Sequence, residues 1–342
     1  MRFHWTRICV IAGVAARIAC VLAGPGAVRT DAIAYRAMAR SLAEGRAFGA
    51  SPWMPGWPVW MSLFFRAGLG ERAIVAGNAI LGVATIVLAG AIARELGRGA
   101  RAAAAITAIV PSLATMPRLL VSENLAVPLF ALATLFLVRA SKRPSIERWA
   151  AFAACAVVAT YVREACIALA FAGLMIAAVK RSASAALVTL GVFAIALAPW
   201  VTSHHGLTAS DGSALCIGLG DGATGGYRAG VSAGCELHLG KLVTLAPAKL
   251  ARLFAWDDWT CDDFFARRPS PRPWAAMRVF CNIAWWALLA AAVAGAIKKP
   301  PPALLAAIGA VAVITVVTFG VGRFHAPLVP LLTVSACYRR RS

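Results

Sequence analysis

The chain has 342 residues, of which 61% are apolar and 14% charged, and its 34 Lys and Arg outnumber its 14 Asp and Glu to give a net charge of +20. A disordered chain would have few apolar residues and many charges, and a soluble domain usually stops at about 45–50% apolar residues. The composition therefore excludes both, and with them a soluble nucleic-acid binder. Most of the chain is expected to lie in lipid.

Ten apolar segments are candidate membrane spans, since each crossing needs roughly 20 apolar residues. The third, fifth and tenth are short. Almost nothing separates the third from the fourth or the fifth from the sixth, so tight re-entrant hairpins and longer broken helices are both open there. Pro111 and Pro117 favour a broken geometry, because proline removes a helix donor and clashes with the preceding turn. In chain order the segments cover residues 8–28, 73–93, 102–117, 120–138, 149–162, 164–179, 184–202, 276–297, 303–320 and 324–338.

The loops between these segments divide the charges unequally. When the loops alternate between two sides, one side carries sixteen Lys and Arg against only Glu95 and Glu147. The positive-inside rule assigns this side, with both termini, to the cytoplasm. Two long segments, 29–72 and 203–275, then face outward, and we expect the chemistry there. Alternatively, residues 1–28 resemble a cleaved signal peptide, which would leave nine spans and invert the assignment.

Residues 30–45, in the first outer segment, are predicted to form an amphipathic helix on the membrane surface. Apolar side chains recur at helical spacing on one face, and charged side chains recur every four residues on another, close enough to pair. The two sets are Tyr35, Met38 and Leu42, and Arg36, Arg40 and Glu44. Thr30 or Asp31 can cap the amino end, and Gly45 can end the helix. Taken alone, Asp31 is better explained as this cap than as a catalytic group.

The run from Asp31 through Tyr35, Leu42 and Gly45 resembles the GT-C class of polytopic glycosyltransferases, in particular the bacterial relatives of protein O-mannosyltransferases and lipid A aminoarabinose transferases. Further motifs resemble the same class in the same order, all at outer ends of the predicted spans. They are the Pro/Trp segment 51–58, Pro111 with Ser122-Glu123-Asn124-Leu125, Tyr161-Val162-Arg163, Pro199-Trp200 followed by Gly212 and residues 218–227, and Gly322-Arg323-Phe324-His325 with Pro327 and Pro330. Many members of the class have a second acid directly after the Asp, where this chain has Ala32, which does not favour a two-carboxylate metal site.

The resemblance implies transfer of a sugar from a polyprenyl-phosphate donor to an acceptor outside the cytoplasm. Asp31 is the expected catalytic base, because the attacking oxygen is a poor nucleophile until it loses its proton. An inverting single displacement needs only this one carboxylate. Arg163, Arg323 and His325 are expected to bind the donor phosphate, since arginine stays ionised and forms bidentate phosphate contacts. For His325, beside Arg323, a structural role at the interface is the alternative.

Four further residues are assigned supporting roles. Glu123 is expected to pair with an arginine of the site or to ligate a divalent metal, Mg²⁺ or Mn²⁺, the one cofactor considered. Tyr35, Trp53 and Trp57 are candidate substrate-binding residues. The two tryptophans also fit an interfacial aromatic belt, which is the better explanation of their position.

The long outer segment contains an acidic cluster and three of the nine cysteines. Asp257, Asp258, Asp262 and Asp263 surround Trp256 and Trp259 in a spacing that fits no Ca²⁺ loop. This favours a solvated acidic patch, either for an acceptor or without a specific role, offset by nearby arginines that include Arg267 and Arg268. An oxidising compartment would allow one disulfide, and Cys216–Cys235 is the preferred pairing, which leaves Cys261 over.

We therefore expect an all-α integral membrane protein of the inner or plasma membrane, with about ten transmembrane helices and amphipathic juxtamembrane helices in the first outer loop. Residues 1–342 are expected to form a single GT-C-like membrane domain without a separate soluble domain. The expected partners are a polyprenyl-phosphate sugar donor, an envelope glycan, lipid or protein acceptor, and the bilayer, but not nucleic acid. The main alternative is a transporter or flippase of a lipid-linked or anionic substrate, which should show inverted repeats and mid-span charges. A member of the class that has lost activity is a third reading.

Overall fold

The computed structural model describes residues 2–28, 31–46, 48, 53–97, 99–204, 211–227, 234–264, 271–298 and 300–338. Within these ranges the chain is almost entirely helical, with no strand and one isolated bridge between Gly226 and Gly320. The predicted all-α class is therefore confirmed. Several residues named from the sequence lie outside the described ranges, namely Thr30, Ser51, Pro52, Arg267 and Arg268.

Five helices of the described chain are long and apolar enough to cross a membrane, or six if one bent pair is a single span. The five are α1 (Arg2–Ala23), α4 (Glu71–Glu95), α7 (Glu123–Lys142), α10 (Ala183–His204) and α15 (Pro271–Ala296). The bent pair is α5 (Ala100–Ile109) with α6 (Pro111–Thr115) and the following turn η1 (Met116–Arg118). Shorter apolar helices are α8 (Ile146–Val162), α9 (Ala168–Val179), α16 (Pro302–Val317) and α17 (Val329–Cys337). Every predicted segment thus coincides with a helix or a broken helix, while the number of ten crossings stays a prediction.

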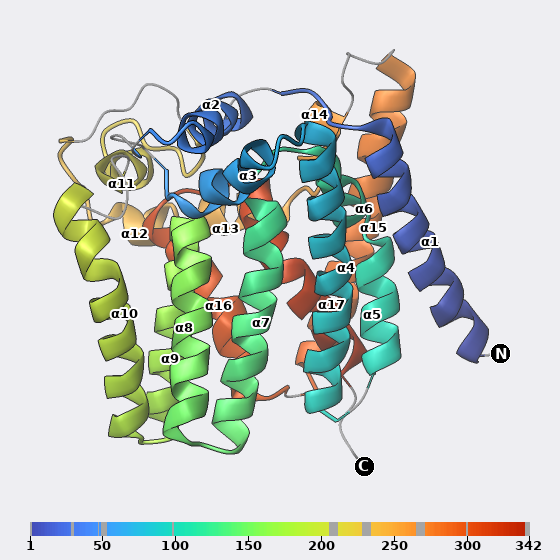
Figure 1. Cartoon of the computed structure of the whole chain (residues 1–342). Coiled ribbons are helices and arrows are strands. Elements are labelled where there is room, and N and C mark those ends of the chain that lie inside the picture. Colours follow the sequence, from blue (N-terminus) through green and yellow to red (C-terminus); the bar gives the residue numbers. More distant parts are fainter. Residues whose placement is uncertain are drawn as a thin grey trace.

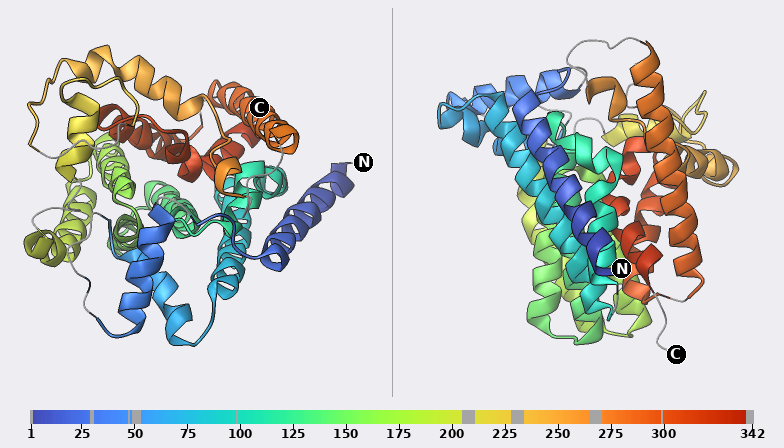
Figure 2. Two further views of the ribbon diagram at one scale, coloured as in Figure 1. Left: turned by 90° about the horizontal axis from the view of Figure 1, so that it is seen from above. Right: turned by 90° about the vertical axis from the view of Figure 1, so that its right-hand side faces the viewer.

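The long helices run side by side, and the short helices gather at one end of them (Figure 1). At the upper end lie α2 (Asp31–Ala43), α3 (Gly56–Arg66), α11 (Asp211–Leu219), α12 (Lys241–Thr244), α13 (Ala246–Phe254) and α14 (Cys261–Phe264). Seen from above, α2 and α3 lie across the ends of the spans (Figure 2). At the lower end, α1 begins, α17 ends, and the connections α4–α5, α7–α8 and α9–α10 turn (Figure 1). The two predicted outer segments therefore share one end and the basic connections share the other. Which end faces the cytoplasm stays a prediction.

The break between α5 and α6 is built around a proline and a buried arginine. Pro111 begins α6, and the two helices meet at 64°. Arg17 in α1 is only 1% exposed, and its guanidinium donates to the carbonyl oxygens of Gly13 (2.8 Å), Ala108 (2.9 Å) and Leu113 (3.1 Å). Because the last two carbonyls flank the break, Arg17 satisfies backbone groups where the helix is interrupted. The broken geometry predicted from the prolines is confirmed.

The helix of the first outer loop is tied to its neighbours on two sides. Its buried side chains are Ala32, Tyr35 and Ala39. On another face, Arg36 and Arg40 both reach Glu71 at the start of α4, at 3.3 and 3.5 Å. Glu44, which the spacing offered as a partner for Arg40, pairs instead with Arg46 at 2.5 Å. Ion pairs with α4 therefore help to fix the position of α2, in addition to any binding of α2 to the membrane surface.

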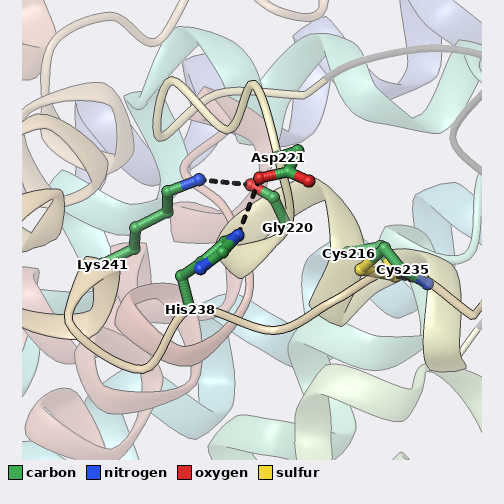
Figure 3. The surroundings of a disulfide bond; sticks show 6 residues. All are labelled: Cys216, Gly220, Asp221, Cys235, His238 and Lys241. Carbon is green, nitrogen blue, oxygen red and sulfur yellow. Dashed lines mark hydrogen bonds and ion pairs between the residues drawn. A yellow bond between two sulfur atoms is a disulfide. The ribbon is translucent and has the colours of Figure 1, made fainter.

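The long outer segment is cross-linked by a disulfide between Cys216 and Cys235, whose Cα atoms are 5.8 Å apart (Figure 3). This is the pairing that the sequence favoured. Close by, Lys241 donates to the carbonyl oxygen of Gly220 at 2.6 Å, and His238 Nε2 lies 2.7 Å from Asp221 Oδ1 (Figure 3). These contacts join α11 to the start of α12.

Two glycines allow the outer segment to pack directly on the end of α16. A Cβ added at Gly218 would lie 1.7 Å from the carbonyl oxygen of Thr318, and one added at Gly320 would lie 2.2 Å from that of Lys249. No other residue fits such a close approach of two backbones. The glycines thereby bring residues 249–259 against the start of η3 (Gly322–Leu328), where the candidate site begins.

Candidate active site

Four charged residues that are far apart in the sequence form one continuous chain of ion pairs at the upper end of the helices. Asp31 Oδ2 accepts from Arg323 at 2.5 Å, and Arg323 Nε lies 3.3 Å from Glu123 Oε1. The same oxygen of Glu123 accepts from Arg163 at 2.5 Å. The order is thus Asp31, Arg323, Glu123 and Arg163. The structure brings together the four outer charges that the sequence singled out.

Each member of this ionic chain sits where a helix begins or ends. Asp31 is the first residue of α2, and Glu123 is the first residue of α7, where the helix dipole favours a negative charge. Arg163 follows α8 in an extended conformation that starts the short turn η2 (Glu164–Ile167). Arg323 is the second residue of η3. Short connections between apolar helices therefore place all four side chains at one level.

The ionic chain runs from a buried end to an open end. The side chains of Glu123 and Arg163 are 1% and 6% exposed, whereas those of Asp31 and Arg323 are 25% and 30% exposed. Two carboxylates balance two guanidinium groups, which is how buried charge is tolerated. Burial acts to lower the pKa of Arg323, but the carboxylates of Glu123 and Asp31 outweigh it and raise this pKa above its ordinary value. Arg323 therefore stays cationic at the open end.

Two motif residues to which the sequence assigned no role of their own complete the buried end. Ser122 accepts from Arg163 at 3.2 Å and donates to the second oxygen of Glu123 at 3.4 Å. The ring of Phe324 lies 5.1 Å from the guanidinium carbon of Arg163, a cation–π distance. Both residues belong to the motifs that resemble the GT-C class, so their place in those motifs was the available signal. The guanidinium of Arg163 is therefore fixed by Glu123, Ser122 and Phe324 together.

Tyr35 and Trp53 pack beside the ionic chain, with ring centroids 5.4 Å apart. Tyr35 is buried in α2, and burial, followed by the charge of Glu164, raises the pKa of its hydroxyl. The hydroxyl therefore stays protonated. Trp53 is half-buried, so of the two predicted tryptophans it is the one that a substrate can reach.

The structure differs from the prediction at Trp57. Its side chain is fully buried in the first turn of α3, and its indole nitrogen donates to the carbonyl oxygen of Leu120 at 3.3 Å. A substrate cannot contact a side chain enclosed in this way. Trp57 instead fixes α3 to the stretch that leads into α7.

The structure also differs at His325, which was expected at the donor phosphate. Its ring is fully buried, with Nδ1 at 2.7 Å from the carbonyl oxygen of Leu253 and Nε2 at 2.8 Å from Asp257 Oδ1. The ring also stacks on Trp285 at a centroid distance of 4.0 Å. Both nitrogens are therefore engaged by the outer segment. These contacts are of the kind that the structural alternative anticipated, with Asp257 as the side-chain partner of His325.

Arg163 is likewise held away from a ligand. Because it is almost fully buried and bonded to Glu123 and Ser122, it sets the position of Glu123. Arg323 is the arginine of the ionic chain that a phosphate can reach. Glu123, bonded to two guanidinium groups, is a poor ligand for Mg²⁺ or Mn²⁺ in this arrangement. In the part of the chain that the structure describes, no group of three or more His, Cys, Asp or Glu could hold a metal.

A cavity of about 210 Å³ opens beside Arg323. Its walls come from the stretch before α7, from the start of η3 and from the outer segment. They are Leu119, Val121, Val321, Gly322 and Arg323, with Arg252, Trp256, Asp258 and Trp259. The acidic cluster is therefore not simply a solvated patch, because Asp257 is buried and Asp258 lines a cavity.

A second contact between cysteines lies next to this wall. Cys261 is the cysteine of the outer segment for which no disulfide partner was predicted. Its sulfur lies 3.8 Å from that of Cys281 in α15, and both thiols are buried. Cys281 falls inside an apolar span, so the sequence gave no reason to associate the two. The contact helps to hold α14 against α15.

Comparison with known proteins gives one sequence match and several structural likenesses. Residues 50–203 match the family model of dolichyl-phosphate-mannose-protein mannosyltransferases, while no curated protein sequence matches the chain. Crystal structures of ArnT from Cupriavidus metallidurans, bound to undecaprenyl phosphate and in the apo state, share 14% identity with TM-scores of 0.45 and 0.46, over 97% of this chain and 77% of that one. Archaeal oligosaccharyltransferase AglB from Archaeoglobus fulgidus, in complex with an inhibitory peptide and a dolichol-phosphate, shares 14% identity with a TM-score of 0.45, over 98% of this chain and 50% of that one.

The segment matched by the family model contains Trp53, Trp57, Glu123 and Arg163, while Asp31 and Arg323 lie outside it. The match therefore covers the buried end of the ionic chain and the Pro/Trp segment before α4. The resemblance of this chain to the GT-C glycosyltransferases is thereby confirmed.

Proposed function

We propose that the protein transfers a sugar from a polyprenyl-phosphate-linked donor to an acceptor of the cell envelope, a glycolipid, polysaccharide or protein. The observation that carries this proposal is the open end of the ionic chain, where Asp31 and Arg323 are each about one quarter to one third exposed and lie 2.5 Å apart. A carboxylate and a fixed cation side by side at the membrane boundary are the two groups that such a transfer requires. The family match over residues 50–203 supports the reaction class.

In an inverting single displacement, the acceptor oxygen bonds to the anomeric carbon as the bond from that carbon to the phosphate oxygen breaks. The proton of the acceptor passes to Asp31 as the base. The phosphate that leaves gains negative charge, and Arg323 stabilises it by bidentate contacts. The lipid tail of the donor lies among the apolar helices, so the reacting atoms meet at the level of Asp31.

The contact between Asp31 and Arg323 has a consequence for the order of events. In the absence of donor, Arg323 occupies the Oδ2 oxygen that the acceptor proton needs. A donor phosphate competes for the same guanidinium, while Glu123, held by Arg163, keeps Arg323 in place through Nε. Binding of the donor therefore frees Asp31 for the acceptor.

The experiment that tests this proposal compares two aspartates of the outer end. Membranes containing the wild-type protein, Asp31→Asn or Asp221→Asn are supplied with radiolabelled polyprenyl-phosphoryl sugars, and label in new glycosidic products is measured. Loss of a general base costs about 10²–10⁴-fold, so Asp31→Asn should fall by that factor. Asp221, 82% exposed on the outer segment, serves as the control and should leave the rate unchanged. Transfer by Asp31→Asn at the wild-type rate would refute the assignment.

The same membranes distinguish the enzyme from a flippase. A flippase moves the labelled lipid across the bilayer without forming a new glycosidic bond, whereas a transferase leaves label in an acceptor. Reporter fusions at residues 45, 145 and 240 test the orientation. We propose that 45 and 240 face the periplasm or exterior of an inner or plasma membrane and that 145 faces the cytoplasm, and a cytoplasmic signal at 240 would overturn the location of the site.

A further inference from the structure

The cavity beside Arg323 has walls that the transfer reaction does not itself require. One side is apolar and aromatic, with the indoles of Trp256 and Trp259, and three charged side chains, Arg252, Asp258 and Arg323, reach it from the others. At about 210 Å³ it is smaller than the pockets of about 300–1,000 Å³ that hold drug-sized ligands. Its size suits a single small polar ring, and its lining combines aromatic faces with hydrogen-bonding groups.

The aromatic wall is held rigidly by the buried histidine. Trp259 donates to Asp257 Oδ1 at 3.1 Å, and the same oxygen faces His325 Nε2. The backbone carbonyl of Leu253 can only accept, so Nδ1 of His325 carries a proton towards it. A further proton must then lie between Nε2 and Asp257, on one or the other, because two acceptors would repel. This proton-sharing pair fixes Trp259 against η3, the element that carries Arg323.

The carboxylate of the polar wall is also held in a fixed orientation by its neighbours. Asp258 is largely buried, and its Oδ2 accepts from Arg278 at 2.5 Å and from Asn282 at 3.3 Å. Both bonds use the same oxygen, so the second oxygen can accept from a ligand hydroxyl. Trp256, 53% exposed, rests on Trp286 with ring centroids 5.2 Å apart. A carboxylate fixed beside two indoles is the arrangement by which proteins hold the hydroxyls and the apolar face of a sugar ring.

We propose that this cavity is the subsite for the sugar ring of the lipid-linked donor, with Trp256 and Trp259 against the ring, Asp258 on its hydroxyls and Arg323 at the phosphate. The inference rests on the proposed function, which supplies a glycosyl phosphate as the donor. His325 and Asp257 are positioning residues in this arrangement, because they act through Trp259.

The position of the cations decides between the sugar of the donor and that of the acceptor. Arg323 is shared by the cavity and the ionic chain, and Arg252 lies in the same wall. A glycosyl phosphate carries its negative charge one bond from the ring, so a ring in this cavity places its phosphate next to these guanidinium groups. An acceptor hydroxyl carries no such charge and needs Asp31.

The test measures binding instead of transfer, and it is made in the Asp31→Asn background so that the donor is not consumed. Two tritium-labelled probes are bound to purified protein in detergent, a polyprenyl phosphate and the same lipid carrying one hexose. The cavity variants are Asp258→Ala and Trp256→Ala, and the matched controls are Asp262→Ala and Trp274→Ala. The two control residues bond to each other at 3.1 Å in the same outer region but lie outside the cavity wall.

The unmodified cavity should prefer the lipid with the hexose by about tenfold, the affinity ratio that one or two good ring contacts supply. Both cavity variants should lose this preference and keep the affinity for the bare lipid phosphate, and the controls should retain both. Trp256→Ala, at a half-exposed position, keeps the test valid if Asp258→Ala folds poorly. Equal weakening of both probes, or an unchanged preference in both cavity variants, would overturn the subsite.

The outcome is separable from that of the proposed function. A preference lost in the cavity variants, together with wild-type transfer by Asp31→Asn, would refute the base and leave the sugar subsite standing. A preference unchanged in the cavity variants, together with Asp31-dependent transfer, would refute the subsite and leave the enzyme. If the same cavity substitutions, made with Asp31 intact, raise KM for the acceptor while donor preference is unchanged, the cavity belongs to the acceptor and the donor assignment is overturned.

Discussion

Arg17 and Arg163 are both buried arginines in an apolar helical protein, but their surroundings differ. Arg17, in α1, donates only to backbone carbonyl oxygens around the break at Pro111. Arg163, at the end of α8, pairs with the carboxylate of Glu123. Glu123 also pairs with Arg323, which in turn pairs with the partly exposed Asp31. Arg17 therefore satisfies the hydrogen bonds of backbone carbonyls, whereas Arg163 belongs to an ion-pair network that reaches solvent.

The difference indicates how a buried charge in a membrane protein should be interpreted. Such a residue is a functional hypothesis by default, yet Arg17 has a sufficient structural reason in the open carbonyls that it satisfies. Gly82 supports this, because a Cβ there would lie 2.6 Å from Arg17 Nε, so α4 is shaped around the side chain. The carboxylate partners and the route to the surface set Arg163 apart.

The largest expected effect concerns the buried pair of Glu123 and Arg163. Removing one partner of a buried ion pair costs about 3–5 kcal/mol, because the other charge is left uncompensated. Arg163→Met and Glu123→Gln should each lower stability, and the double variant should lose less than the sum of the two. Unfolding of the purified proteins in detergent measures this coupling. Strictly additive losses would show that the two side chains do not act as a pair.

Arg17→Met is expected to affect stability and to leave activity intact. It exposes the carbonyls of Ala108 and Leu113 to an apolar environment, at about 1–3 kcal/mol for each unsatisfied group. The unfolding temperature should therefore fall clearly, while transfer per folded molecule stays near that of the wild type. A specific loss of transfer in correctly folded Arg17→Met would remove the distinction between the two arginines.

Arg323→Lys tests the open end with a charge-conserving change. Lysine keeps the cation but cannot reach Asp31 and Glu123 at once or bind a phosphate in a bidentate manner. Transfer should fall by about 10–100-fold, equivalent to roughly 1.4–2.8 kcal/mol, while stability changes by at most about 1 kcal/mol because the pair is partly exposed. Kinetics and unfolding of the same preparation give both values. A large loss of stability with unchanged turnover would mean that Arg323, like Arg17, has a structural role and no role in transfer.

Much of this arrangement follows from the sequence. The apolar runs predict the helices, and the two prolines predict the break. Asp31, Glu123, Arg163 and Arg323 stood out because they lie in motifs that resemble the GT-C class, at the ends of the predicted spans. Their direct contact could not be predicted, since α2, α7, α8 and η3 meet only after the whole bundle has packed.

The outer segment was harder to interpret from sequence. Asp257 and Asp258 are adjacent acids, but one faces inward to His325 and the other faces a cavity. Local spacing does not reveal this, because the partner of Asp257 lies 68 residues away. Trp57 and Trp53 differ for the same reason, since the packing of α3 on the stretch before α7 buries only one of them.

The smallest expected effect is a pH dependence that originates at Tyr35, beside the ionic chain. Burial raises the pKa of its hydroxyl in the folded protein, while the unfolded chain ionises near the ordinary value of about 10. The contribution of Tyr35 to stability is therefore fully present below about pH 10 and is lost above it, by at most about 1.4 kcal/mol per pH unit. Tyr35→Phe should flatten the fall of the unfolding temperature between about pH 10 and 11.5, whereas Tyr227→Phe, at a 64% exposed position, should not. If Tyr35→Phe retains the wild-type slope, the hydroxyl of Tyr35 is not buried beside the ionic chain in the folded protein.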